Sequence, residues 1–477
     1  MGKKISSKLF AELEHIVGVH NIIKEREKML DYSHDEFSLK EISRMPDMVV
    51  KPSSAVETSS ILKLACRENI PVTPRGGATG LCGGCVPQYG GIVLSLENMN
   101  RIKEIDKDSQ MAVVEAGVTL MEFSRAVEDE GLYFPPHPGD ESAFIGGLIA
   151  TNAGGSRAVK YGVIRHYICG LEVVLPTGKI IRLGGKLIKS STGYSLLNLM
   201  IGSEGTLGVI TEAVIRLLPF PGAIRTLIIP YHGLEEAIET VPLLLKKNIL
   251  PMAVEFIPRE VIQVTEDYLQ KKWPCAEGET HLAVILDARG TDELDFLSEE
   301  VAEICFEKGA LDVFVADSPQ KQRDVLEIRS KIYEAIKTYT VEILDIVVPR
   351  GEIAVHVKKV QEVSEKYGIW LPTFGHAADG NVHTHIMKGR YVDGKIIPVP
   401  ENTWRPKIDQ VREELYRDCR LRGGMISGEH GIGLVKQPFI DLVLDEETLS
   451  LMRGIKDVFD PDRILNPGKI FPMNKEI

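Results

Sequence analysis

Four of the twelve histidines lie in two short polar motifs near the end of the chain. His376, His383 and His385 belong to GHAADGNVHTH, and His430 follows Glu429 in SGEHGIG. The DGN sequence after His376 predicts a tight turn, which can return the imidazoles of His376 and His383 to one point from the two arms of a hairpin. Imidazoles placed in this way can bind a metal ion or move a proton.

A nearby carboxylate would complete a metal site with three protein ligands. Two nitrogens from His376 and His383 and one oxygen from Glu429 suit Zn²⁺, Mn²⁺ or Fe²⁺, and they leave positions open for a substrate hydroxyl and carboxylate. The His-x6-His spacing alone is a weak metal signal, because an isolated histidine is usually a core or surface residue. The hypothesis therefore depends on the GEHG motif and on the glycine-rich segments upstream.

Glycines concentrate in three segments of the first half: RGGATGLCGG at 75–84, IGGLIATNAGG at 145–155 and IGSEGTLGVI at 201–210. Glycine allows a backbone to approach a ligand closely, and consecutive N–H groups can hold pyrophosphate oxygens. No strict GxGxxG leads from a strand into a helix, and GxxxxGK[ST] does not occur, so the nicotinamide Rossmann and Walker patterns are not met. The phosphates of a dinucleotide would have to be held in another way.

The elements that must position these groups differ between the two halves of the chain. After an opening helix at 9–17, the runs MVVKP, ETSSILKLACREN and IPVTP predict a β-α-β start from Met48. From about Arg225, amphipathic helices alternate with β-like runs such as HLAVILDA, LDVFVAD and EIAVHV, which indicates a separate α+β domain. A polar insert at 388–406 predicts a loop or hairpin, and a helix is expected at 407–421.

Composition excludes several classes of protein. The 477 residues, 44% hydrophobic and 26% charged, are typical of a folded chain of two or three domains. A net charge of -12 disfavours binding to nucleic acid or to anionic lipid. No apolar run reaches the roughly 18 residues of a spanning helix, and the first residues lack the apolar stretch of a signal peptide, so we expect a cytoplasmic protein.

The seven cysteines are odd in number and mostly isolated, which predicts reduced thiols. Only Cys82 and Cys85 form a CxxC pair, and there is no second pair to complete a four-thiolate cluster. Any iron–sulfur relay that serves this protein would therefore lie on another chain.

Several motifs together resemble one family. PRGGATGLCGG, HPGDESAFIGGLIATNAGGSRAVKYG and IGSEGTLGVITE resemble the flavin domain of the vanillyl-alcohol oxidase and p-cresol methylhydroxylase superfamily. GHAADGNVHTH and SGEHGIG resemble its branch of FAD-dependent D-2-hydroxyacid dehydrogenases. The resemblance implies an α+β fold with a two-subdomain FAD-binding domain at 1–221, a substrate (cap) domain with the metal site at 222–415, and a C-terminal segment at 416–477 that returns to the FAD domain.

The same resemblance implies FAD, with the pyrophosphate on 75–84 and the flavin ring on 142–155 and 202–210. Members that attach FAD covalently often use a histidine just after the first glycine pair, and here that position is Ala78, so we expect non-covalent FAD. The residues expected to contact FAD are Arg75, Gly76, Gly77, Ala78, Thr79, Gly80, Gly83, Gly84, Pro138, Ser142, Gly146, Gly147, Thr151, Asn152, Gly154, Gly155, Gly162, Glu204, Gly205, Gly208, Val209, Ile210 and Asn466.

The resemblance also assigns roles in catalysis. It supports His376, His383 and Glu429 as metal ligands, and it implies that His430 takes the hydroxyl proton while hydride passes to flavin N5. Arg329 stands where family members carry an anchor for the substrate carboxylate, although a solvated helix charge is an equal alternative. The role of His385 stays open between substrate contact and support of a metal ligand.

The expected substrate is a small monocarboxylate. Family enzymes for dicarboxylic 2-hydroxy acids tend to carry a lysine where this chain has the apolar Ile343 and Leu344. D-lactate is therefore favoured, with glycolate as the alternative, and a non-catalytic FAD-carrying electron-transfer subunit is the alternative of another class. The electron acceptor stays open between an electron-transferring flavoprotein, an iron–sulfur subunit leading to quinone, and a soluble acceptor.

Overall fold

The computed structural model describes residues 6–37, 42–316 and 318–472. It divides into two compact units. The first contains Met1–Ala153, Val163–Phe220 and Glu429–Ile477, and the second contains Gly154–Gly162 and Pro221–Gly428. Apart from the short excursion at Gly154–Gly162, the chain enters the second unit after Phe220, next to the expected boundary at 221, and it leaves this unit only after Gly428 and not at 415. The reason is that the backbones of Met425 and Val347 pair in the second unit.

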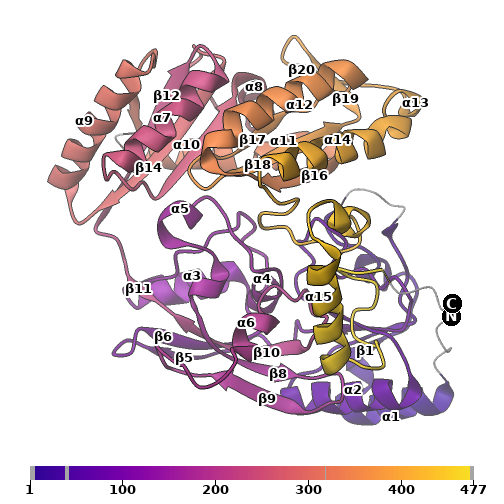
Figure 1. Cartoon of the computed structure of the whole chain (residues 1–477). Helices are drawn as coiled ribbons and strands as arrows, with labels where there is room; N and C mark the ends of the chain where they lie inside the picture. Colours follow the sequence, from indigo (N-terminus) through magenta and orange to yellow (C-terminus); the bar gives the residue numbers. More distant parts are fainter. Residues whose placement is uncertain (1–5, 38–41, 317, 473–477) are drawn as a thin grey trace. The chain divides into compact units, whose positions relative to one another are not determined.

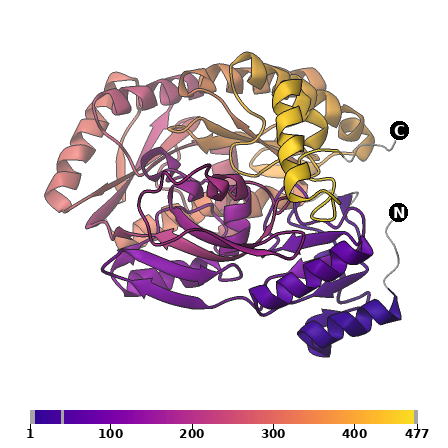
Figure 2. The ribbon, with the colours of Figure 1, turned by 60° about the horizontal axis from the view of Figure 1, so that its bottom comes forward.

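The first unit begins with the predicted β-α-β arrangement. Helix α1 (Ser7–Val17) packs beside α2 (Ala55–Glu68), as both ribbon views show (Figures 1 and 2). The Ser54 hydroxyl caps α2 by accepting from the Glu57 amide. The sheet has the order β1-β2-β4-β3, with β2, β4 and β3 parallel. Its strands are β1 (Ile22–Ile23), β2 (Met48–Val50), β3 (Val72–Arg75) and β4 (Ile92–Ser95).

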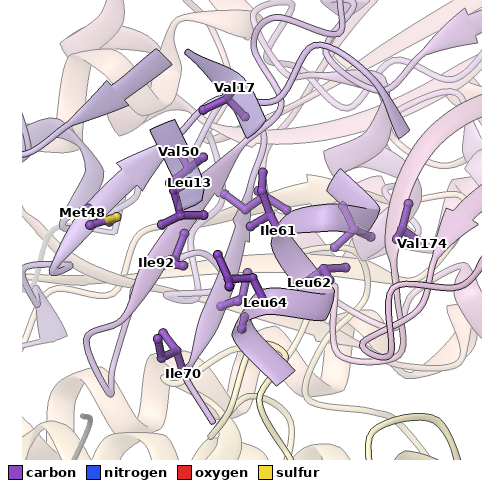
Figure 3. Close-up of a cluster of buried hydrophobic side chains, with 14 of the residues drawn as sticks. Leu13, Val17, Met48, Val50, Ile61, Leu62, Leu64, Ile70, Ile92 and Val174 are labelled. Carbon is purple, nitrogen blue, oxygen red and sulfur yellow. The ribbon is translucent and has the colours of Figure 1, made fainter. Parts of the chain in front are cut away.

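A hydrophobic core joins this sheet to its helices (Figure 3). Leu13 of α1, Val50 of β2, Ile61 and Leu62 of α2 and Ile92 of β4 are all fully buried in it. Burial of each such side chain stabilises the fold by roughly 1.5–3 kcal/mol. The core holds β3 in place, and the glycine-rich loop at 75–84 begins at the end of that strand.

The second sheet of this unit is antiparallel and has the order β5-β6-β10-β8-β9. Its strands are β5 (Ile102–Asp106), β6 (Met111–Glu115), β8 (Ile168–Val174), β9 (Ile180–Gly184) and β10 (Val209–Arg216). The remaining elements of the unit are α3 (Leu120–Asp129), β7 (Leu132–Tyr133), α4 (Ile145–Thr151), α6 (Leu196–Met200), β11 (Leu218–Pro219) and α15 (Glu446–Phe459).

The C-terminal segment returns to the first sheet, in agreement with the expected fold. After α15 the chain runs beside β3, where the Val72 amide donates to the Ile464 carbonyl at 2.8 Å and the Asn466 amide donates to the Val72 carbonyl at 2.7 Å. This pairing brings Asn466 next to the strand from which the 75–84 loop starts.

The second unit is built on a seven-stranded antiparallel sheet with the order β15-β12-β14-β13-β17-β18-β16. Its strands are β12 (Ala223–Tyr231), β13 (Ala253–Pro258), β14 (Thr280–Ala288), β15 (Phe314–Ala316), β16 (Thr340–Val347), β17 (Thr373–His376) and β18 (Asn381–Met387). The insert at 388–406 forms the predicted hairpin of β19 (Gly389–Val392) and β20 (Lys395–Pro398), followed by α13 (Glu401–Trp404).

Helices contact both faces of this sheet (Figure 1). One face packs on α8 (Arg259–Leu269), α10 (Pro319–Ser330) and α11 (Ile332–Ile336). The opposite face contacts α7 (Leu234–Lys246), α9 (Thr291–Glu307) and α14 (Ile408–Leu421), and α12 (Ile353–Tyr367) packs against α14. Short α5 (Ala158–Tyr161) belongs to this unit, because Lys160 and Tyr161 both bond to Asp287 at 2.6 Å.

One predicted element is wrong. EIAVHV, expected as a β-like run, lies in the 3-10 turn and first turns of α12, whose buried Ile353, Val357 and Val360 have helical spacing. A short apolar run cannot by itself distinguish a strand from a buried helix. Within the described ranges, no helix is both long and apolar enough to cross a membrane.

Candidate active site

Four polar side chains lie on one face of the second sheet. The β-sheet register pairs Glu255 of β13 with His376 of β17, and Asp345 of β16 with His383 of β18. Directly opposed residues share a face, and the register of β17 with β18 places His376 and His383 on the same face. The four side chains are buried, between 0% and 7% exposed.

The tight turn between β17 and β18 brings the two imidazoles together, as predicted. The Asp379 carboxylate accepts from the Asn381 amide at 3.1 Å. Gly380 has φ +96°, and a Cβ at this position would lie 2.1 Å from the Val348 carbonyl oxygen, so only glycine fits. His376 Nε2 and His383 Nε2 then lie 3.4 Å apart, with the rings nearly perpendicular at 86°. Two facing imidazole nitrogens fit a shared divalent cation.

Glu255 lies behind the first of these histidines. Its Oε1 lies 2.5 Å from His376 Nδ1, and its Oε2 accepts from Arg329 Nε at 2.7 Å and also from Arg329 Nη2. Burial alone would raise the pKa of Glu255, but the charge of Arg329 and the hydrogen bonds from Arg329 and His376 lower it to about 2. The carboxylate is therefore ionised and can only accept hydrogen bonds.

Asp345 lies behind the second histidine. Its Oδ1 is 3.7 Å from His383 Nδ1 and accepts from Asn381 Nδ2 at 2.8 Å. Its Oδ2 accepts from the Ser427 hydroxyl and from the Gly428 amide, both at 3.0 Å. Asp345 thus connects the histidine hairpin to the segment that leads directly into Glu429.

Arg329 is not a solvated helix charge. Its side chain projects from α10, is 19% exposed and pairs with buried Glu255. The guanidinium carbon lies 5.6 Å from the Phe374 ring centroid. Its Nη1 donates to no residue that the structure describes, so this group can donate to a ligand.

His385 lies two residues beyond His383 on β18, and its side chain is 1% exposed. Its ring stacks on Phe374 at 4.9 Å between centroids, and its Nδ1 lies 3.3 Å from the Thr340 hydroxyl. This packing supports His385 as part of the wall beside Phe374.

Glu429 and His430 open the last segment of the first unit. Glu429 Oε1 and His430 Nε2 lie 4.0 Å apart. The residues that follow are held by Glu204, whose two carboxylate oxygens accept from the Ile432 amide at 2.7 Å and the Gly433 amide at 2.8 Å. Glu204 was expected to contact FAD, but its carboxylate is occupied in fixing the backbone after His430.

The glycine loop at 75–84 has the properties of an anion-binding nest. The N–H groups of residues 76–80 donate to no acceptor in the part of the chain that the structure describes, and Ala78 has φ +61°. A Cβ on Gly77 would lie 2.9 Å from the Ser142 carbonyl, so only glycine lets the first two predicted segments meet. Gly84 and Gly147 face open space. These observations fit a bound pyrophosphate.

Two side chains brace this loop. Asp35 accepts from the Gly83 amide at 2.7 Å and from the Phe37 amide at 3.1 Å, and burial raises its pKa to about 6 although these donors oppose the change. Arg75 donates to the carbonyls of Asp31 and His34, so its guanidinium holds the 31–34 turn.

Asn466 links two of the predicted segments. Its Nδ2 donates to the Gly84 carbonyl at 3.0 Å and to the Glu204 carbonyl at 2.7 Å. Its Oδ1 is buried and accepts from no described residue, which leaves one acceptor for a ligand.

The other expected FAD contacts lie around these segments. In the first unit they are Thr79, Pro138, Gly146, Thr151, Asn152, Gly205, Gly208, Val209 and Ile210, whereas Gly154, Gly155 and Gly162 belong to the second unit. Asn152 ends α4 in the left-handed region, and its Oδ1 accepts from the Arg165 amide at 3.1 Å. Val209 and Ile210 pair with Val174 and Val173 in the sheet, so their backbones are largely occupied by β8.

Three residues of these sites were not anticipated: Asp35, Glu255 and Asp345. The last two carried a signal, because each is an acid within a largely apolar strand: Glu255 in AVEFIP, and Asp345, with Glu342, in EILDIVV. An acid in such a position must find a partner when the strand is buried.

Comparison with known proteins adds to this geometry. The family described as "FAD binding domain" matches residues 46–184, and the family described as "FAD linked oxidases, C-terminal domain" matches residues 220–470. A D-lactate dehydrogenase of Archaeoglobus fulgidus is 45% identical over 423 residues, which are 89% of this chain and 91% of the relative. A D-lactate dehydrogenase of Anaerostipes hadrus is 40% identical, covering 92% of each chain, and a glycolate oxidase subunit of Bacillus subtilis is 37% identical, covering 96% of each.

Solved structures with low sequence identity share the fold. p-Cresol methylhydroxylase aligns over 100% of both chains with a TM-score of 0.80 and 17% identity. 4-Ethylphenol oxidase of Gulosibacter chungangensis aligns over the same extent with a TM-score of 0.78 and 18% identity.

Proposed function

This chain belongs to the FAD-linked oxidase family, and we propose that it oxidises a small D-2-hydroxy acid, with D-lactate as the preferred substrate and pyruvate as the product. Oxidation of a small 2-hydroxy acid is the activity for which these relatives are named, and the "FAD binding domain" family matches residues 46–184 of this chain. The observation that carries the proposal is the pair of facing imidazoles, each backed by a buried carboxylate, with Arg329 bonded to one of these carboxylates.

The first unit is proposed to hold FAD without a covalent bond. The amides of residues 76–80, which donate to no described acceptor, would hold the pyrophosphate, and Asn466 Oδ1 offers an acceptor to an N–H or O–H group of the cofactor. Ala78, at the position of the histidine attachment, has no atom to form a bond with the flavin. When bound, FAD would supply the acceptor for the hydride from substrate C2. Acid precipitation should release all the flavin into the supernatant, and flavin that stays in the pellet would contradict this part of the proposal.

The second unit is proposed to hold the substrate. His376 and His383 would bind a divalent cation together with Glu429. Glu429 directly follows Gly428, and the Gly428 amide donates to Asp345. Such a cation would supply Lewis-acid polarisation of the substrate hydroxyl. His430 would take the hydroxyl proton, because a neutral imidazole is a suitable base near neutral pH. Arg329 Nη1 would bind the carboxylate.

D-lactate is favoured over a dicarboxylic substrate. Ile343 lies opposite His385 in the sheet and Leu344 is fully buried, so no cation stands at these positions for a second carboxylate. D-lactate dehydrogenases match this chain at 40–45% identity, whereas two D-2-hydroxyglutarate dehydrogenases match at 30% and 32%. Glycolate is the second candidate, supported by the Bacillus subtilis relative.

The test is anaerobic mixing of the purified protein with D-lactate, L-lactate, glycolate and D-2-hydroxyglutarate while the flavin absorbance is followed. D-lactate should bleach the flavin fastest and L-lactate should leave it oxidised. A protein that none of the four reduces would be an electron-transfer subunit without catalysis. The electrons are proposed to pass to a partner flavoprotein, an iron–sulfur subunit or quinone, since the sequence has only one CxxC pair, Cys82 and Cys85, and no second pair for a four-thiolate cluster.

A further inference from the structure

Glu255 contacts both Arg329 and His376. It lies in β13, its side chain is 1% exposed, and each of its oxygens has its own partner. Oε1 faces His376 Nδ1 and Oε2 faces the Nε and Nη2 groups of Arg329. A residue of this kind can determine the state of two functional groups at once.

The contact with His376 determines where the imidazole proton lies. The Glu255 carboxylate accepts from Arg329 through Oε2, and its Oε1 lies 2.5 Å from His376 Nδ1, so Nδ1 is the ring nitrogen that donates and carries the proton. The lone pair of the neutral ring is then on Nε2, the atom that lies 3.4 Å from His383 Nε2. A histidine binds a metal only through an unprotonated nitrogen, and carboxylates behind metal-binding histidines commonly fix the tautomer in this way.

The contact with Arg329 determines which face of the guanidinium is available. Glu255 occupies the edge formed by Nε and Nη2, and the ring of Phe374 lies 5.6 Å from the guanidinium carbon. The planar group therefore has one fixed orientation, with Nη1 not used by any described residue.

We propose that Glu255 is a positioning residue that holds His376 in the tautomer able to bind a divalent cation and orients Arg329 to bind the substrate carboxylate. This inference rests on the proposed function, and it adds that cation affinity and substrate affinity depend on one buried carboxylate. Loss of that carboxylate should weaken both, although Glu255 touches neither the cation nor the substrate.

The test is Glu255→Gln in the FAD-loaded protein. Glutamine has nearly the same shape, and its amide oxygen can still accept from Arg329, but its NH₂ group then faces His376 Nδ1 and favours a proton on Nε2. We expect Zn²⁺ affinity, titrated into metal-stripped protein with Zn²⁺ alone, to fall by about 10- to 100-fold. With D-lactate, KM should rise as well, because Arg329 is less firmly held.

A spectroscopic measurement separates this role from general damage. ¹⁵N shifts of the histidine side chains in metal-free protein should show His376 protonated on Nδ1 in the wild type and on Nε2 in Glu255→Gln. Glu342→Gln is the matched control, because Glu342 is also buried and its carboxylate also pairs with an arginine, Arg412, but on the opposite face of the same sheet. This variant should lose stability and keep the wild-type Zn²⁺ affinity and tautomer.

The outcomes are distinguishable. If Glu255→Gln binds Zn²⁺ as tightly as the wild type and keeps the Nδ1 proton on His376, the inference is wrong. If both variants lose Zn²⁺ affinity equally, Glu255 is only structural and the inference is again wrong. If the wild type is not reduced by any 2-hydroxy acid, the proposed function fails, while the histidine tautomer in the two proteins still tests the effect of Glu255.

Discussion

The glycine loop of the first unit and the polar sheet face of the second unit differ in the groups that they offer to a charged ligand. The loop offers backbone amides, and the buried acid that braces it, Asp35, accepts from the neutral amides of Gly83 and Phe37. Burial raises the pKa of Asp35 to about 6, although these donors and the charge of Arg75 oppose the change. The sheet face offers charged side chains in pairs, and the pKa of Glu255 falls to about 2 beside Arg329 and His376.

The difference follows from what each region has to do. Amide groups cannot lose a proton or change charge, so a loop of this kind suits a phosphate that is bound permanently. Imidazole and carboxylate groups can bind a cation and move a proton, so the sheet face suits chemistry. The first region should therefore determine whether FAD is retained and the second whether it is reduced.

The largest expected effect comes from His376→Ala. The variant should keep its FAD and its yellow colour, but D-lactate should no longer reduce the flavin at a detectable rate, because the proposed cation would lose one of its two imidazole ligands. Removal of metal from the wild type with a chelator should have the same result, and added Zn²⁺ or Mn²⁺ should reverse only the chelation. Stopped-flow absorbance measures both.

His281→Ala is the control for this prediction. His281 is also a fully buried histidine of the same sheet, but its Nδ1 accepts from the Trp273 indole at 3.0 Å. His281→Ala should therefore lower the stability of the fold and leave the rate of flavin reduction unchanged. If D-lactate reduced the flavin of metal-free protein at the full rate, flavin reduction would not depend on a cation at the sheet face.

The two regions also differ in how much of them the sequence predicts. The glycine segments, the β-α-β start and the histidine hairpin follow from local signals, namely turn residues, alternation and spacing. Glu255 could not be paired with His376 in advance, because 120 residues separate them and only the strand order β13-β17-β18-β16 makes them neighbours. Likewise, Arg329 was found by resemblance, but its partner was not.

Asp345 illustrates a signal that was present and not used. EILDIVV is typical of a buried strand, and the acids within such a run, Glu342 and Asp345, require donors. Those donors come from Asn381, Ser427 and Gly428, which are distant in sequence. Sequence reasoning can therefore identify an acid that needs partners, whereas the partners depend on how the strands are ordered.

The next largest effect separates proton removal from cation binding at two adjacent residues. His430→Ala should keep the cation and reduce its flavin about 10²- to 10⁴-fold more slowly, because the base is missing. Higher pH should restore part of the rate, since hydroxide can replace the imidazole. Glu429→Gln should instead lose cation affinity, because an anionic ligand is removed.

Metal analysis measures the cation content of the two variants, and stopped-flow absorbance measures how fast D-lactate reduces their flavin. If His430→Ala lost its metal while Glu429→Gln kept it, the roles of the two neighbours would have to be exchanged.

The smallest effect tests the opposite charge states of the two regions. Asp35 has a folded-state pKa of about 6, above its usual value of 3.8. As the pH falls from 7 to 4, the folded protein takes up this proton before the unfolded chain does, so the free energy of unfolding rises. Asparagine does not titrate, and the stability of the wild type relative to Asp35→Asn should therefore increase by up to about 3 kcal/mol over this range.

Urea denaturation of the two proteins at matched pH measures the difference, with Asp140→Asn, an exposed acid, as the control for loss of one charge. The sign is opposite to that for Glu255, whose lowered pKa stabilises the fold above its usual pKa and stops doing so as the pH falls towards 2. A difference that does not change with pH would mean that the amides of Gly83 and Phe37 hold Asp35 ionised. The loop would then stabilise a buried negative charge as well as the sheet face does. In that case, the difference between neutral and charged donors would not explain why the two regions differ.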